Sequence, residues 1–321
     1  MSTFRFIETN GVRLRAVVEG EGPLVVFVHG FPESWYSWRH QIGPVAAAGF
    51  TACAIDVRGY GGSDKPEPVD AYAMQHLVAD VAGVIETLSP DRNAILVGHD
   101  WGAPIVWTTA FARPDRVAAV AGLSVPHLGE PPAPFIDIVG KIFTDNGRFF
   151  YQVYFQDEGV AEAEMEADVR GALRKFYYAI SGDAPDHTWP PDKAHGAVLL
   201  DRLPDPEPFP AWLTKADEDY YVGEFSQSGF RGPLNRYRNH RRDFAWVRRL
   251  PSRAINQPAL FIGGSRDLVL KMIPGSDPVA AMAPHLPNLQ GAHILEGCGH
   301  WTQQERPAEV NALLIPWLKG L

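Results

Sequence analysis

The feature that most constrains the fold is the segment Gly98-His99-Asp100-Trp101-Gly102. The apolar run Ala94–Val97 before it predicts a buried strand, and Ala103–Arg113 after it predicts a helix. Because glycine has no Cβ, the two glycines let the chain turn sharply from strand into helix. Asp100 then stands against the first N–H groups of the helix, which favour an ionised carboxylate. We therefore predict an anionic nucleophile at Asp100, with an ordinary helix N-cap as the alternative.

Strand-like and helix-like segments alternate along most of the chain. Short apolar runs predict strands at Phe4–Glu8, Val12–Val18, Leu24–Val28, Thr51–Asp56, Ala94–Val97, Val117–Leu123, Ala259–Ile262 and Ala292–Leu295. Between most of them lie segments typical of helices, at Trp35–Ala48, Met74–Leu88, Ala103–Arg113 and Pro307–Leu318. Asn10-Gly11 predicts a two-residue hairpin between the first two strands. This order predicts an α/β fold with a mainly parallel, doubly wound sheet that binds ligands at the carboxyl ends of its strands.

The alternation stops after Ser124-Val125-Pro126 and resumes at Ala259. The intervening sequence contains proline clusters, many aromatic residues and helix-like segments such as Val160–Tyr178. We therefore expect residues 1–125 and 247–321 to form the core, and residues 126–246 to form a helical lid inserted after the sixth strand. Most of its aromatic side chains would pack within the lid, and a few would line an apolar pocket against the sheet.

Composition and charge exclude several classes of partner. The chain of 321 residues suits one α/β domain with an insertion, and its formal net charge of −9 argues against nucleic acid or an anionic membrane surface. No apolar run is long enough to span a bilayer, and residues 1–5 lack the pattern of a signal peptide. Cys53 and Cys298 give no disulfide framework, so we expect a cytoplasmic protein.

Two other strand ends carry residues that suit a nucleophile at Asp100. The strand Leu260–Ile262 leads toward Asp267, and the strand His293–Leu295 leads toward His300. The chain order nucleophile, acid, histidine resembles that of the α/β-hydrolases. We predict that His300 is the general base and that Asp267 accepts its ring N–H. Asp277 is the competing acid, but it follows a proline-glycine turn instead of a strand.

The loop His29-Gly30-Phe31-Pro32-Glu33 also follows a strand. In the α/β-hydrolases this loop supplies one backbone N–H of the oxyanion hole, here that of Phe31, and the residue after the nucleophile, here Trp101, supplies the other. The Phe31-Pro32 peptide bond is a candidate for the cis form. His99, beside the nucleophile, is predicted to be a packed, hydrogen-bonded histidine beneath the turn.

An aspartate nucleophile predicts substitution at a saturated carbon atom. Attack by serine would leave an ether that water does not readily cleave, whereas a carboxylate leaves an ester that water activated by His300 can hydrolyse. The leaving group is then either the oxygen of an epoxide, which needs a proton donor, or a halide, which needs N–H donors.

Over nearly its whole length the chain resembles the epoxide hydrolases of the α/β-hydrolase fold. The matching segments are His29–Ser34, Gly98–Gly102, Tyr151–Gln156 and Gly229–Asn239. The resemblance implies an α/β-hydrolase fold in which two lid tyrosines, Tyr151 and Tyr237, donate hydrogen bonds to the epoxide oxygen. Tyr154 lies one helical turn from Tyr151 and is the alternative first donor. The resemblance also implies a small hydrophobic epoxide and water as substrates, a vicinal diol as product, and no metal or cofactor.

Two alternative functions stay open at this point. A haloalkane or haloacid dehalogenase would use the same triad, but haloalkane enzymes often have Asn where Phe31 stands, and haloacid enzymes have Arg where Trp101 stands. A ligand-binding protein without activity would not need Asp100, His300 and Asp267 together. The oligomeric state is also open, and a homodimer is one assembly compatible with the sequence.

Overall fold

The computed structural model of the protein describes residues 4–272 and 277–321, so the first three residues of the N-terminal stretch lie outside the described residues. The strands are β1 Phe4–Thr9, β2 Val12–Glu19, β3 Leu24–Val28, β4 Thr51–Ile55, β5 Ala94–His99, β6 Val117–Leu123, β7 Ala259–Gly264 and β8 Leu289–Leu295. The helices are α1 Arg39–Ala47, α2 Met74–Leu88, α3 Gly102–Ala112, α4 Phe135–Ile142, α5 Tyr151–Tyr154, α6 Val160–Ala167, α7 Val169–Ala179, α8 Lys215–Ser228, α9 Arg231–Tyr237, α10 His240–Val247, α11 Thr302–Glu305 and α12 Pro307–Lys319.

The strands form one sheet in the order β1-β2-β4-β3-β5-β6-β7-β8. β1 and β2 pair antiparallel, as do β2 and β4, whereas the pairs from β4 through β3 to β8 are parallel. Asn10 and Gly11 join β1 to β2 with φ values of 46° and 74°, and a type I′ turn requires positive φ at both positions. The predicted mainly parallel sheet and its hairpin are therefore confirmed.

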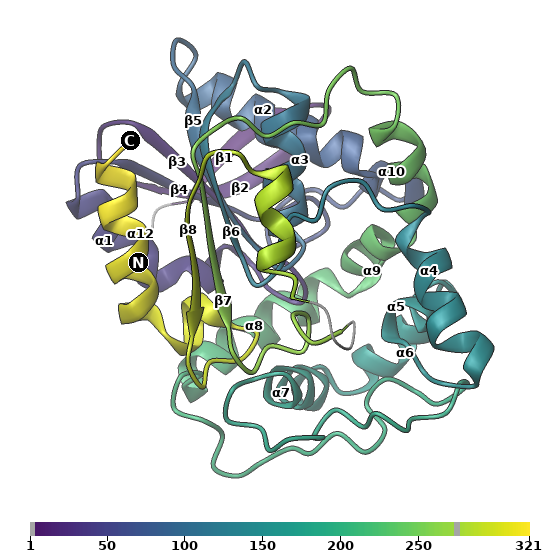
Figure 1. The fold of residues 1–321 in the computed structure, drawn as a ribbon. Helices are drawn as coiled ribbons and strands as arrows, with labels where there is room; N and C mark the ends of the chain where they lie inside the picture. The colour runs from purple at the N-terminus through teal and green to yellow at the C-terminus, as the bar shows by residue number, and fades with distance from the viewer. Residues whose placement is uncertain (1–3, 273–276) are drawn as a thin grey trace.

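Helices cover both faces of the sheet. α1 and α12 lie on one side, and α2 and α3 lie on the other (Figure 1). The sequence of β3 is apolar throughout because both faces of this strand are covered. Val25 and Phe27 pack in the cluster with α1 and α12, while Val26 and Val28 pack in the cluster with α2 and α3. Alternate side chains of a strand point to opposite faces, so a strand covered on both sides has no polar face.

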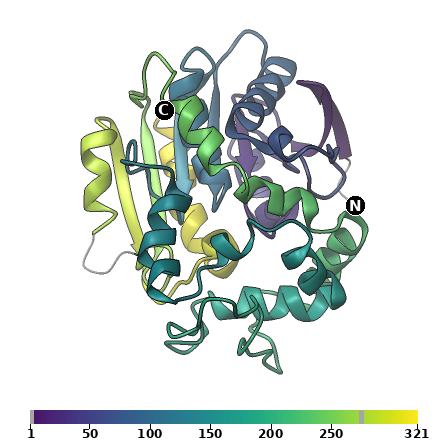
Figure 2. The same cartoon turned by 90° about the vertical axis from the view of Figure 1, so that its right-hand side faces the viewer.

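The chain between β6 and β7 carries the helices α4 to α10, which we call the helical insertion. In Figure 1 these helices extend from below the strands, where α7 and α8 lie, along the right-hand side to α10 beside α2, and they lie on the side that faces the viewer in Figure 2. The position after the sixth strand agrees with the sequence, and the boundaries at residues 125 and 247 stay a prediction. The helix-like segment Val160–Tyr178 is helical in the structure, but as two helices instead of one. It divides into α6 and α7 at Asp168, whose carboxylate accepts a hydrogen bond of 3.0 Å from Gly171 N and so caps α7.

The strand register brings the predicted site segments to one edge of the sheet. Val28 of β3 pairs with Gly98 of β5, and Leu123 of β6 pairs with Ile262 of β7. Gly264 at the end of β7 pairs with Leu295 at the end of β8. Because these neighbouring strands are parallel, the loops that follow them start side by side.

In the part of the chain that the structure describes, no helix has the length and apolar character needed to cross a membrane. Cys53 and Cys298 are both buried free thiols. Burial raises the pKa of the Cys53 thiol to about 12 and also raises that of Cys298, so neither thiol ionises readily at neutral pH. Both cysteines therefore behave as small core residues.

The turn between β5 and α3 generates a first prediction, on stability. A Cβ added to Gly98 would lie 2.2 Å from the carbonyl oxygen of Gly102, which is a backbone atom that cannot move aside. We expect Gly98→Ala to lower the free energy of unfolding by about 1–3 kcal/mol or more, measured by denaturant titration. In the matched variant Gly223→Ala, in the interior of α8, the new Cβ meets no atom within 4 Å. That variant should raise the free energy of unfolding by about 0.4–1 kcal/mol, and equal effects of the two would contradict the interpretation.

Candidate active site

Asp100 occupies the turn between β5 and α3 in a left-handed conformation, with φ 48°. Its Oδ1 accepts a hydrogen bond of 2.7 Å from Phe31 N, and its Oδ2 lies 3.3 Å from His300 Nε2. Burial tends to raise the pKa of Asp100, but the hydrogen bond and charge of His300, followed by His99 and the Phe31 N–H, bring it below its usual range. The carboxylate is therefore anionic at neutral pH. A positive φ at a non-glycine residue is uncommon, and such residues are often found at functional sites.

His300 joins Asp100 to Asp267. The Nδ1 atom of His300 lies 3.1 Å from each carboxylate oxygen of Asp267, while Nε2 faces Asp100. Asp267 is fully buried and His300 is 2% exposed. Burial tends to lower the pKa of His300, but the charge of Asp267 and the contacts with both carboxylates bring it well above its usual range. The sequence thus identified three side chains that do lie together in space.

Asp277, the competing acid, lies elsewhere. It is exposed, and its Oδ1 accepts hydrogen bonds of 3.1 Å from Val279 N and 2.9 Å from Ala280 N. These contacts lie at the start of the short 3-10 helix Ala280–His285 and do not involve His300. The geometry therefore favours Asp267 as the partner of the histidine.

The two expected oxyanion-hole donors differ in their contacts with Asp100. Phe31 N donates to Asp100 Oδ1, and the Phe31-Pro32 peptide bond is cis, as predicted. Trp101 is the N-cap residue of α3, and among the described residues its backbone N–H makes no hydrogen bond with Asp100. An oxyanion hole is arranged for the tetrahedral intermediate rather than for the resting carboxylate, so one donor can stand free before reaction.

The helical insertion carries both predicted tyrosines toward Asp100. Burial, followed by the charge of Asp100, raises the pKa of Tyr151 and of Tyr237, so both phenols stay protonated. Their ring centroids are 6.0 Å apart. Gln152 Nε2 donates a hydrogen bond of 2.8 Å to the Tyr151 hydroxyl oxygen and leaves the phenolic proton free. The hydroxyl of Tyr154 instead donates to Glu164 at 2.8 Å, so the geometry favours Tyr151 over Tyr154.

A cavity of about 470 Å³ extends from Asp100 and Tyr151 to the surface of the protein. Asp100, Trp101 and Tyr151 lie along it, together with apolar side chains such as Trp107 and Phe111. At its exposed rim Glu130 forms ion pairs of 3.1 Å with Arg248 and 3.0 Å with Arg253. A second hollow of about 490 Å³, bounded by the 186–192 loop and residues 202 and 204, contains none of the predicted site residues. The apolar cavity is therefore the binding-site candidate.

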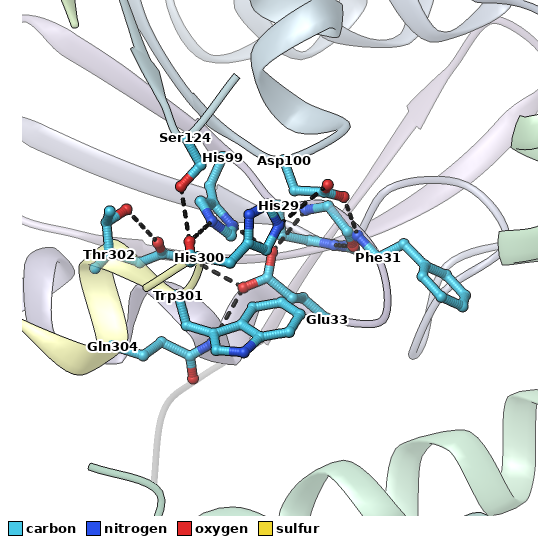
Figure 3. A network of polar contacts seen from close by, with 12 residues as sticks. His29, Phe31, Glu33, His99, Asp100, Ser124, His300, Trp301, Thr302 and Gln304 are labelled. Carbon is cyan, nitrogen blue, oxygen red and sulfur yellow. Dashed lines mark hydrogen bonds and ion pairs between the residues drawn. The ribbon is translucent and has the colours of Figure 1, made fainter. Parts of the chain in front are cut away.

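A fully buried carboxylate, Glu33, organises the polar network beneath Asp100 (Figure 3). It accepts hydrogen bonds of 2.8 Å from Gly30 N, 3.0 Å from Gln303 and 3.1 Å from Gln304, and lies 2.8 Å from His99 Nδ1. His99 Nε2 donates to the carbonyl oxygen of His300 at 2.7 Å. Burial tends to raise the pKa of Glu33, but the charge and hydrogen bond of His99 bring it below its usual range, so the carboxylate is ionised at neutral pH.

The sequence predicted a packed, hydrogen-bonded His99, and the structure confirms it. It assigned no role to Glu33. The only signal in the sequence was an acidic residue in the loop that directly follows a buried strand. Three further polar residues of the cavity wall, Gln152, Arg236 and His240, also had no assigned role, because nothing in their spacing distinguishes them from packing residues.

Comparisons with known proteins agree with this geometry. The family model of the alpha/beta hydrolase fold matches residues 23–307. The chain is 42% identical to epoxide hydrolase A of Mycobacterium tuberculosis, over 99% of this chain and 98% of that protein. It is similar to the solved structure of an epoxide hydrolase from an endophytic Streptomyces, with 49% identity, a TM-score of 0.94, and coverage of 99% of this chain and 96% of the other.

A further solved structure, epoxide hydrolase A from Mycobacterium thermoresistibile, is 43% identical with a TM-score of 0.91, and the match covers 100% of this chain and 99% of that one. Similarity of this extent includes the sheet, the helical insertion and every segment of the site. The chain therefore belongs to the epoxide hydrolases of the α/β-hydrolase fold.

Proposed function

We propose that this epoxide hydrolase opens a hydrophobic epoxide to a vicinal diol through an ester between the substrate and Asp100. The observation that supports this most strongly is an ionised Asp100 that contacts His300 and shares one apolar cavity with the phenol of Tyr151. In the same proposal residues 126–246 act as the lid, and the two buried free thiols support a cytoplasmic location.

In the first step Asp100 Oδ2 forms a bond to one carbon of the epoxide, and the bond between that carbon and the ring oxygen breaks. The electron pair moves to the ring oxygen, which takes a proton from the Tyr151 or Tyr237 hydroxyl. The resting His300 imidazolium then returns a proton to the tyrosinate through water in the cavity. Because alkylation removes the charge of Asp100, one cause of the raised pKa of His300 disappears, and the imidazole becomes a base.

In the second step water adds to the ester carbonyl carbon and gives one proton to His300 Nε2. The Phe31 N–H, which already holds Oδ1, and the Trp101 N–H stabilise the oxyanion. Collapse breaks the bond between the acyl carbon and the ester oxygen, and the alkoxide takes the proton of the new carboxyl group. The products are the diol, the carboxylate of Asp100 and the imidazolium of His300, so the resting state is restored.

Oxygen labelling tests the ester intermediate. With enzyme in excess over epoxide in ¹⁸O-water, we expect the diol of the first turnover to contain no ¹⁸O, because its new oxygen comes from Asp100. Mass spectrometry should find the label in the peptide that contains Asp100. A labelled diol in the first turnover would mean that water attacks the epoxide directly, and the proposed mechanism would be wrong.

Removal of the base should trap the ester. We expect His300→Gln to form the alkyl-enzyme and to hydrolyse it at least about 100-fold more slowly, because general base catalysis contributes about 10²–10⁴-fold. Intact-protein mass spectrometry should then show an increase equal to the mass of the epoxide. Asp100→Asn is the control and should show no increase. Normal diol formation by His300→Gln would contradict the role of His300.

The roles of Tyr151 and Tyr237 can be tested with Tyr154, which lies on the same helix as Tyr151, as the control. We expect Tyr151→Phe and Tyr237→Phe each to slow ring opening about 10–100-fold, since one proton donor remains in each variant. Tyr154→Phe should leave the rate of ring opening nearly unchanged, because its hydroxyl contacts Glu164 instead of the cavity. Stopped-flow fluorescence or quenched-flow assays measure the rate of ring opening. Slow ring opening by Tyr154→Phe together with a normal rate for Tyr151→Phe would show that Tyr154, and not Tyr151, is the proton donor.

A further inference from the structure

The wall of the apolar cavity contains buried polar atoms that the proposed mechanism does not use. His240 Nε2, Arg236 Nε and Gln152 Oε1 have no hydrogen-bond partner among the described residues, and all three residues line the cavity. Most buried polar groups in proteins are paired, because an unpaired one costs free energy. Because these unpaired atoms belong to residues that line one cavity, these residues are the candidates for polar contact with a ligand.

His240 is the most informative of the three. It is the first residue of α10, is 8% exposed, and its ring packs against Trp101 with a centroid distance of 5.6 Å. Phe135 packs against it at 5.7 Å. A phenylalanine at this position would provide the same ring packing without burying a nitrogen. The imidazole therefore offers a hydrogen-bonding atom beside Trp101, the residue that directly follows the nucleophile.

The surroundings of His240 carry no uncompensated charge. The guanidinium of Arg236 lies 4.5 Å above the Trp101 ring and forms an ion pair with Asp243. Asp243 also accepts a hydrogen bond of 2.7 Å from Met74 N. Burial, and then the charge of Arg236, lower the pKa of His240 to about 3, so the imidazole is neutral at neutral pH. Arg241, the other cation that acts on His240, pairs with Asp137. Among the described residues, a carboxylate on the substrate would therefore find no unpaired cation beside His240 and would lie near Asp243.

We propose that His240 is a substrate-specificity residue whose ring nitrogen forms a hydrogen bond with an uncharged hydroxyl group carried on a side arm of the epoxide. This inference rests on the proposed function. A hydroxyl fits best because it both donates and accepts, so it can pair with either tautomer of the imidazole and with the neighbouring Arg236 or Gln152. The preferred substrates are therefore epoxides with an alcohol group, and an ether oxygen, which only accepts, should be a weaker substitute.

The test compares two epoxides of nearly equal size, 5,6-epoxyhexan-1-ol and 1,2-epoxyheptane, in which a methyl group replaces the hydroxyl. We expect the wild-type protein to have the higher kcat/KM with the epoxy alcohol. His240→Phe keeps the ring packing and should lower kcat/KM for the epoxy alcohol about 5- to 10-fold, mainly through KM, while 1,2-epoxyheptane changes less than about 2-fold. His240→Gln restores a donor and an acceptor and should recover part of the preference.

The outcomes separate this inference from the proposed function. A wild-type protein that prefers 1,2-epoxyheptane, or a ratio of the two kcat/KM values that His240→Phe leaves unchanged, would overturn the role of His240 while diol formation continues. Equal losses with both epoxides would show that His240 only supports packing, and would overturn it as well. The absence of diol from every epoxide would overturn the proposed function, and this inference with it.

Discussion

The contacts of the buried Glu33 carboxylate hold the site together. They join the loop after β3, the end of β5 and the segment after His300, which are far apart in the sequence but adjacent at the sheet edge. His99, the partner of Glu33, also holds the backbone of His300 in place by donating a hydrogen bond to the carbonyl oxygen of His300. A buried charge without its partner costs about 3–5 kcal/mol, so each member of this network depends on the others. The position of the nucleophile relative to the base therefore depends on a group that never touches the substrate.

The helical insertion contributes to this rigidity as well as to the cavity. From the end of α7, the Tyr177 hydroxyl donates to the carbonyl oxygen of Pro32 at 2.6 Å, and the carbonyl oxygen of Ile180 accepts from His300 N at 2.9 Å. Trp301 donates its indole N–H to the carbonyl oxygen of Tyr177 at 2.8 Å. The helix thus contacts both the loop of Phe31 and the loop of His300. The same segment that carries the tyrosines fixes the parts of the core that face them.

Much of the fold and part of the site could be predicted from sequence, for a physical reason. Asp100 and Asp267 follow strands that are buried on both faces and apolar throughout, and His300 follows the parallel edge strand β8, so their meeting at one edge could be expected. Contacts between distant segments gave no such signal. Glu33 acquires its partners only in the folded chain, and Tyr151 is distinguished from Tyr154 only by contacts in the folded structure, since Tyr151 lines the cavity while the Tyr154 hydroxyl donates to Glu164. The break at Asp168 was missed because an aspartate fits the polar face of a continuous helix as well as it fits a cap.

The ion pairs of Glu130 with Arg248 and Arg253 lie where the chain leaves the core for the insertion and where it returns. These two connections also border the rim of the cavity. The opening through which a reactant passes is thus built from the same stretches of backbone that attach the insertion to the sheet. A change in the length of either connection would alter both the cavity opening and the attachment of the helical insertion. Access to the Asp100 carboxylate therefore depends on how the insertion is joined to the core.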